Sequence, residues 1–174
     1  MRLSPCPRAR AAVCRDTGLT LIELMVTMAL ASLLMTIGIL AMKSYLLSNR
    51  QANTADGIRS TLRLAGERSL SEGRTYCVSF TTTTWTVYRA DCTVAANRMG
   101  GPEQVQDPSI TLTSIAFPAP ATAIPGQTTA CPTAGKCAYF YPRGTALKGS
   151  LQVVRGSKTY TVSVEGLTSR VSLA

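Results

Sequence analysis

The sequence predicts an α+β protein in which a long hydrophobic amino-terminal helix packs against a small antiparallel β-sheet or β-sandwich domain. Three observations lead to this prediction. An apolar run over residues 19–42 contains a single charged residue. A proline-free stretch with helical spacing follows over residues 43–73. From residue 74 onward, short alternating segments are separated by turn residues, which is typical of antiparallel strands.

The first 18 residues form a short basic leader. They carry four arginines (Arg2, Arg8, Arg10 and Arg15) and one aspartate, a net charge of +3. Basic residues before an apolar run and a larger domain after it predict that the amino terminus stays in the cytoplasm and the carboxy-terminal part is exported. The part from residue 43 onward is also basic, with 14 Lys or Arg against seven Asp or Glu.

The apolar run is long enough to cross a membrane. At about 1.5 Å per residue, a helix of these 24 residues spans roughly 36 Å, and the hydrocarbon core of a bilayer is roughly 30 Å thick. Glu23 is its one charged residue. A carboxylate inside a membrane helix costs on the order of 3 kcal/mol. We therefore expect Glu23 to have a partner; the alternative is a carboxylate that reaches the interface from near the helix end.

Two common kinds of targeting segment explain only part of this pattern. A secretory signal peptide would be cleaved at the small residues of Ala29-Leu30-Ala31, but the apolar run continues to Met42. A plain signal anchor explains the length and gives Glu23 no role. Both interpretations leave a β domain in the periplasm, secreted or anchored by its signal, that is unrelated to fibres.

The stretch GLTLIEL, between the leader and the apolar run, resembles the class III signal of type IV prepilins and type II secretion pseudopilins. The resemblance implies that a prepilin peptidase cuts after Gly18 and methylates the new amino terminus at Leu19, where this family usually has phenylalanine. Thr20 and Glu23 stand at their family positions. Glu23 would then pair with the amine of a neighbouring subunit and set the register of assembly.

Residues 43–73 are expected to form the second half of the same long helix. One face is marked by Leu47, Ala55, Ile58, Leu62, Ala65 and Ser69. Gly73 is the expected stop. Gly57 and Gly66 weaken this prediction of one unbroken helix without replacing it, because each costs about 1 kcal/mol relative to alanine.

The remainder, residues 74–174, is expected to be a periplasmic domain of two packed sheets with the helix against one side. The predicted strands are TYCVSF and TWTVYRA as a hairpin, SITLTSIAF, AYFY, the hairpin SLQVVRGSKTYTVSV, and SRVSL. The Pro-, Ala- and Thr-rich stretch PAPATAIPGQTTACPTAGKC, residues 118–137, is expected to be a surface loop.

Four of the six cysteines lie in the exported part. An even number in an oxidising compartment predicts two disulfides, with three connectivities open. Local spacing favours Cys77–Cys92 and Cys131–Cys137. Four buried free thiols are the alternative.

The second half of the chain resembles minor pseudopilins of the GspH/FimT type. The resemblance rests on SNRQANTADGIRSTLRLAGERSLSEGRTYCVS and on YFYPRGTALKGSLQVV, with Phe140, Pro142 and Gly144 at the matching positions. It implies a minor pilin or pseudopilin near the tip, or at the start, of a type IV pilus or type II secretion pseudopilus. The implied partners are other pilins or pseudopilins, prepilin peptidase, an inner-membrane assembly platform and membrane lipid.

We expect no enzyme, cofactor or metal site. The sequence has no histidine, which excludes histidine-dependent triads, and no C-x-x-C pair for zinc. A second function, DNA binding, is suggested by a basic carboxy-terminal region near aromatic residues. Its candidate contacts are Arg143, Lys148, Arg155, Lys158 and Arg170; Arg170 is what remains of the family's closing G-R-x-R motif. Solvent-facing basic residues without a ligand are the alternative.

Overall fold

The computed structural model describes residues 20–119, 131–132 and 136–174. Gly18, Leu19 and most of the predicted loop at 118–137 lie outside these residues. The chain divides into two compact units, Met1–Met42 and Lys43–Ala174. Helix α1, Leu21–Glu72, begins in the first unit and ends in the second.

Helix α1 ends where the sequence predicts. Gly73 follows its last residue with a φ of 62°, a left-handed conformation that glycine adopts without steric cost. The backbone N–H of Arg74 donates to the carbonyl of Ser69 at 3.2 Å. This is the 6→1 bond of a Schellman motif, which satisfies a carbonyl that the helix end leaves unpaired.

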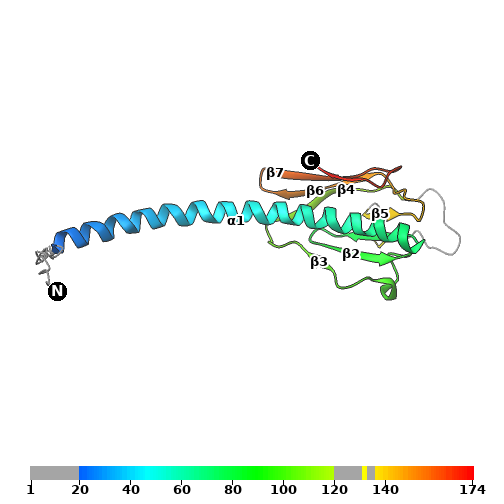
Figure 1. The fold of residues 1–174 in the computed structure, drawn as a ribbon, viewed down its shortest axis with the longest axis horizontal. Helices are drawn as coiled ribbons and strands as arrows, with labels where there is room; N and C mark the ends of the chain where they lie inside the picture. Colours follow the sequence, from blue (N-terminus) through cyan, green and yellow to red (C-terminus); the bar gives the residue numbers. More distant parts are fainter. Residues whose placement is uncertain (1–19, 120–130, 133–135) are drawn as a thin grey trace, which may run out of the picture. The chain divides into compact units, whose positions relative to one another are not determined.

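In the described part of the second unit, eight strands form two four-stranded sheets (Figure 1). The first sheet has the order β3-β2-β1-β5, with β1 at Tyr76–Phe80, β2 at Thr84–Arg89, β3 at Glu103–Gln104 and β5 at Cys137–Phe140. The second has the order β4-β6-β7-β8, with β4 at Thr111–Ala116, β6 at Gly149–Arg155, β7 at Lys158–Val164 and β8 at Val171–Leu173. All neighbouring strands are antiparallel. The α+β prediction with two antiparallel sheets is confirmed.

Two short elements were not expected from the sequence. Strand β3 has two residues, both exposed, and pairs with Thr84 and Trp85 of β2. The 3-10 helix η1, Ala95–Asn97, buries none of its side chains. Neither can show the buried–exposed alternation on which sequence-based strand prediction depends.

The second half of α1 contacts both sheets, and its two glycines lie at contacts with aromatic rings. A Cβ at Gly66 would lie 3.4 Å from the ring of Phe140, and one at Gly57 would lie 3.8 Å from Trp85. The Trp85 indole N–H also donates to the Thr61 hydroxyl at 3.3 Å. Helix α1 is unbroken through both glycines, as the prediction of one long helix requires, and a Cβ at either position would meet its aromatic ring at an ordinary van der Waals distance.

The core lies between the helix and both sheets. The helix contributes Ala55, Ile58, Leu62 and Ala65, all at most 1% exposed. Strands β6 and β7 contribute alternate residues, Leu151, Val153, Val162 and Val164. Phe80, at the end of β1, stacks on Phe117, just after β4, with ring centroids 5.7 Å apart. This stack joins the two sheets.

Polar contacts also fix the helix to the β domain. Gln51 is fully buried, and its side-chain amide donates to the carbonyls of Val153 and Lys158 at 3.1 and 2.9 Å. Arg50 forms a salt bridge of 3.1 Å with Asp107, in the segment before β4. Both contacts join segments more than 50 residues apart, so they fix the position of the helix relative to the second sheet.

Candidate functional site

The start of α1 carries the one acidic residue of the apolar segment. Thr20 precedes the first helical residue, and its hydroxyl oxygen accepts a hydrogen bond from the backbone N–H of Glu23 at 3.3 Å. Thr20-Leu21-Ile22-Glu23 therefore has the spacing of a capping box, in which a threonine and a glutamate three residues later satisfy the first helical turn. The first helical turn also favours a negative charge electrostatically. The T-x-x-E spacing could have predicted this cap from the sequence.

The hydroxyl groups further along the apolar segment bond to the helix itself. Thr27 donates to the carbonyl of Leu24 at 2.9 Å, Ser32 to that of Ala29 at 2.8 Å, and Thr36 to that of Ser32 at 2.8 Å. Such bonds let hydroxyl groups enter an apolar environment without an unpaired donor. Glu23 differs from them, because its carboxylate has no hydrogen bond or ion pair within the described part of the chain.

The apolar side chains of this segment are exposed within the single chain. Leu21 is 80% exposed, and the large apolar residues that follow, up to Met42, are at least 46% exposed wherever the structure describes them. Among the described helices, α1 is long and apolar enough to cross a membrane by length and composition. An exposed apolar surface of this extent indicates contact with lipid or with other proteins.

Family comparisons match both parts of the chain. The model of the prokaryotic N-terminal methylation motif matches residues 14–39, which include Gly18, Leu19 and Glu23. The model described as "Type II transport protein GspH" matches residues 54–168, which is most of the second unit. The chain belongs to the GspH family. A comparison with curated proteins finds no match.

Two solved structures share the fold of this GspH-family chain at low sequence identity. Two structures of the minor pseudopilin EpsH from the type 2 secretion system of Vibrio cholerae match with a TM-score of 0.50 and identities of 13% and 12%. The matches cover 72% of this chain and 96% and 93% of those chains. The type IV minor pilin FimU of Pseudomonas aeruginosa matches with a TM-score of 0.49 and 11% identity, over 72% of this chain and 89% of that chain.

Four of the five residues predicted to contact DNA lie in two pairs at opposite ends of the second sheet, and the fifth, Arg143, lies in the turn after β5 of the first sheet. Arg155 and Lys158 face each other across the β6–β7 hairpin end. Lys148 and Arg170 directly precede β6 and β8, whose first residues flank Val164 at the other end of β7. Because β6 has seven residues at about 3.3 Å each, roughly 20 Å separates the two ends. The structure therefore does not bring these residues into one stripe.

Two of the five cations, Lys158 and Arg143, lie close to helix α1. The ammonium group of Lys158 donates to the hydroxyl of Ser48 on α1 at 3.2 Å, so part of its hydrogen bonding is within the domain. Arg143 lies in the turn after β5, and a Cβ at its neighbour Gly144 would lie 3.2 Å from Leu70 on the last turns of α1. Arg143 is exposed there.

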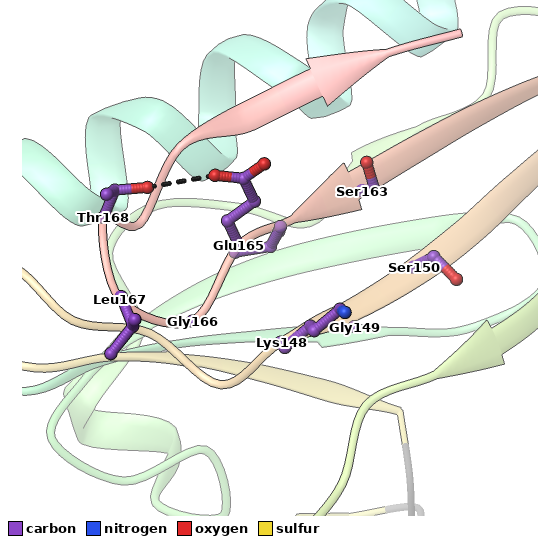
Figure 2. Close-up of a pocket in the computed structure, with 9 residues that line it drawn as sticks. Lys148, Gly149, Ser150, Ser163, Glu165, Gly166, Leu167 and Thr168 are labelled. Carbon is purple, nitrogen blue, oxygen red and sulfur yellow. Dashed lines mark hydrogen bonds between the residues drawn. The ribbon is translucent and has the colours of Figure 1, made fainter.

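A groove of about 890 Å³ lies beside Lys148, between the start of β6 and the segment after β7 (Figure 2). Its lining includes Lys148, Glu165 and the hydroxyl groups of Ser150 and Ser163. The Glu165 carboxylate accepts a hydrogen bond from Thr168 at 3.2 Å. The positive charge of Lys148 and the negative charge of Glu165 cancel in this groove. Its charge therefore does not favour the binding of a phosphate group.

The structure contains both predicted disulfides. Cys77 is joined to Cys92, which confirms that prediction, and Cys131 is joined to Cys137. Cys77, Cys92 and Cys137 form a small buried cluster with Tyr139, outside the main core. Burial raises the pKa of the Tyr139 hydroxyl to about 12, with the nearby Asp91 and Tyr141 adding to the effect.

Proposed function

We propose that this GspH-family chain is a minor pilin or pseudopilin that is matured by a prepilin peptidase and assembled into a type IV pilus or a type II secretion pseudopilus. The leader, residues 1–18, is removed after Gly18, and the new amino terminus at Leu19 is methylated. Residues 19–42 hold the chain in the inner membrane before assembly, with the amino terminus cytoplasmic. Residues 43–73 continue the helix, and residues 74–174 form the periplasmic domain.

One observation carries this proposal: an N-terminal methylation motif at residues 14–39 stands on the same chain as a GspH domain at residues 54–168. The exposed apolar segment of α1 supports it, because such a surface suits lipid before assembly and other helices after it. Its partners are then the helices of other pilins or pseudopilins, prepilin peptidase, membrane lipid and the inner-membrane assembly platform.

Glu23 is the assembly residue in this proposal. Cleavage after Gly18 creates a positively charged amine four residues before Glu23. A carboxylate in apolar surroundings is costly when unpaired and much less costly when it meets a cation. Stacked helices can therefore pair each Glu23 with the amine of a neighbouring subunit, which sets the axial register. A position at the start or tip of the fibre is suggested by the resemblance to minor pseudopilins.

The experiment is incorporation into fibres in a strain that carries the rest of the machine. Glu23→Ala is expected to leave membrane insertion unchanged and to reduce the amount of the subunit in sheared fibres. Glu67→Ala is the matched control, because Glu67 is an exposed glutamate on the same helix outside the apolar segment. Equal incorporation of the two variants would contradict the role of Glu23. Deletion of the gene distinguishes the machines: loss of twitching indicates a pilus, and loss of enzyme secretion indicates a pseudopilus.

A further inference from the structure

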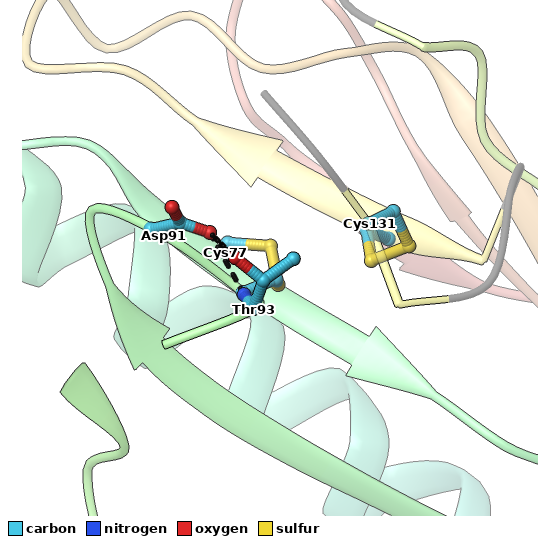
Figure 3. Close-up of a disulfide and its surroundings, with 6 residues drawn as sticks. Cys77, Asp91, Thr93 and Cys131 are labelled. Atoms are coloured by element: carbon cyan, nitrogen blue, oxygen red, sulfur yellow. Dashed lines mark hydrogen bonds between the residues drawn. A yellow bond between two sulfur atoms is a disulfide. The ribbon is translucent and has the colours of Figure 1, made fainter. Parts of the chain in front are cut away.

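The two disulfides lie next to each other on the first sheet. Cys77 is on β1 and Cys137 is on the neighbouring strand β5, where it pairs with Ser79. Cys92 lies just beyond β2. The sulfur atoms of Cys77, Cys92 and Cys137 all lie within 4.8 Å of one another. Figure 3 shows the Cys77 and Cys131 disulfides side by side.

The four cysteines differ in exposure. Cys77, Cys92 and Cys137 are at most 2% exposed, whereas Cys131 is partly exposed. A thiol in solution therefore has access to the Cys131–Cys137 bond through Cys131, and no comparable access to the Cys77–Cys92 bond. Disulfides are exchanged by attack of a thiolate on a sulfur atom, so access decides which bond reacts first.

We propose that the four cysteines form one thiol–disulfide exchange site, with Cys131 as the point of entry and Cys137 as the transferring sulfur. The external thiolate attacks Sγ of Cys131, which forms a mixed disulfide and releases Cys137 as a thiolate. The Cys137 thiolate then attacks the Cys77–Cys92 bond beside it. A new disulfide forms between Cys137 and one of these two cysteines, and the other cysteine is released as a thiolate. The protein then holds one internal disulfide and one mixed disulfide with the external thiol at Cys131.

Geometry favours Cys92 as the sulfur that Cys137 attacks. Cys77 and Cys137 are on paired strands but are offset by two residues, because Cys77 pairs with Tyr139. Such diagonal pairs have Cα atoms roughly 7–8 Å apart, whereas a disulfide needs roughly 4.4–6.8 Å. Cys92 lies in a loop and can move toward Cys137 without shifting a strand. Its neighbour Asp91 accepts hydrogen bonds from the backbone N–H and hydroxyl of Thr93 at 2.8 and 2.7 Å, and because both residues lie in the same loop these bonds can move with Cys92. The favoured product is Cys92–Cys137, with Cys77 released as a thiol.

The chemistry of this site identifies its partner as a thiol, either a low-molecular-weight thiol or a dithiol oxidoreductase. The proposal stands on the sulfur positions and does not depend on assembly into a fibre. The consequence is that a thiol that reacts with the exposed Cys131–Cys137 bond also opens the buried Cys77–Cys92 bond, which joins β1 to the loop after β2.

The test uses the full chain in detergent, with Cys6→Ser and Cys14→Ser in every variant so that leader thiols do not react. Cys131→Ser leaves Cys137 as a free thiol beside the intact bond. After equilibration at mildly alkaline pH and alkylation, unreduced peptide mapping is expected to show a Cys92–Cys137 peptide and alkylated Cys77. Finding only Cys77–Cys92, with all the alkylation on Cys137, would overturn the proposal.

Cys137→Ser is the matched control. It leaves a thiol at Cys131 and removes the sulfur that lies within 4.8 Å of both Cys77 and Cys92. Cys77–Cys92 is expected to persist in this variant. If both variants rearrange to the same extent, Cys137 is not the transferring sulfur and the proposal fails.

A third measurement avoids any effect of substitutions at Cys131 or Cys137 on folding. The chain with these four cysteines intact is incubated with reduced glutathione and then alkylated. The expected result is a glutathione adduct on Cys131 together with an alkylated Cys77. An adduct on Cys137, or an adduct on Cys131 with alkylation only on Cys137, would contradict the transfer step.

Discussion

The hydroxyl oxygen of Thr20 accepts a hydrogen bond from the backbone N–H of Glu23 and so fixes the first turn of α1. This contact links the residue that caps the helix to the residue that we assign to assembly. If the first turn of the helix frayed, the distance between the Glu23 carboxylate and the Leu19 amine of a neighbouring subunit would change. Thr20 is therefore a positioning residue for Glu23.

Thr20→Val is expected to reduce incorporation into fibres, because loss of an N-cap costs about 1 kcal/mol of helix stability. Thr20→Ser keeps an oxygen at the same position and is expected to retain incorporation. Mass spectrometry of both variants checks that leader removal is unchanged. Equal incorporation of the valine and serine variants would show that the cap has no part in assembly.

Gln51→Leu is expected to destabilise the domain by about 1–3 kcal/mol. It removes the donor to the carbonyls of Val153 and Lys158, at a fully buried position. The free energy of unfolding in denaturant measures the effect. Asn53→Leu is the control, because it also replaces a polar side chain by leucine on the same helix but at an exposed position.

Gly149→Ala is expected to destabilise the domain by about 1–3 kcal/mol through overpacking. A Cβ at this position would overlap the ring of Phe117 and would lie 2.6 Å from the carbonyl oxygen of Ala116. Gly101→Ala is the control, since a Cβ at Gly101 would meet no atom within 4 Å. A drop in melting temperature for Gly101→Ala equal to that for Gly149→Ala would contradict this account.

Asp107 is expected to contribute stability that is lost in acid. The hydrogen bonds from the hydroxyl and backbone N–H of Ser109, followed by that from Arg50, hold the pKa of this carboxyl below its ordinary value. The contribution is therefore fully present above the unfolded pKa of about 3.9, and it disappears as the pH falls through the lower folded pKa. Asp107→Asn should be less stable than the unchanged chain at neutral pH, and the difference should shrink below pH 4. Melting temperatures between pH 7 and pH 3 measure this; a constant difference would contradict it.

Much of the fold could be predicted from periodicity. Ala55, Ile58, Leu62 and Ala65 have helical spacing and are buried, and the β6–β7 hairpin alternates as expected. Long apolar or alternating segments carry this signal because one face of each must leave water.

Contacts between distant residues could not be predicted in the same way. Gln51 looks like a surface residue in the sequence, and only the position of the β6–β7 hairpin shows why an amide is buried there. The surroundings of Gly57 and Gly66 could not be predicted for the same reason, because the aromatic rings beside them come from β2 and β5. The distance between Lys148 and Arg155 likewise depends on the strand register, which cannot be predicted from the amino-acid composition.

The measurement that tests the central claim most directly is the intact mass and amino-terminal sequence of the chain, expressed with and without a prepilin peptidase. Our account predicts that the peptidase removes residues 1–18 and that the product begins at a methylated Leu19, with Glu23 as its fifth residue. Cleavage after Ala31, or a chain that stays uncleaved when the peptidase is present, would contradict the assignment to a fibre and leave a secreted or membrane-anchored β domain.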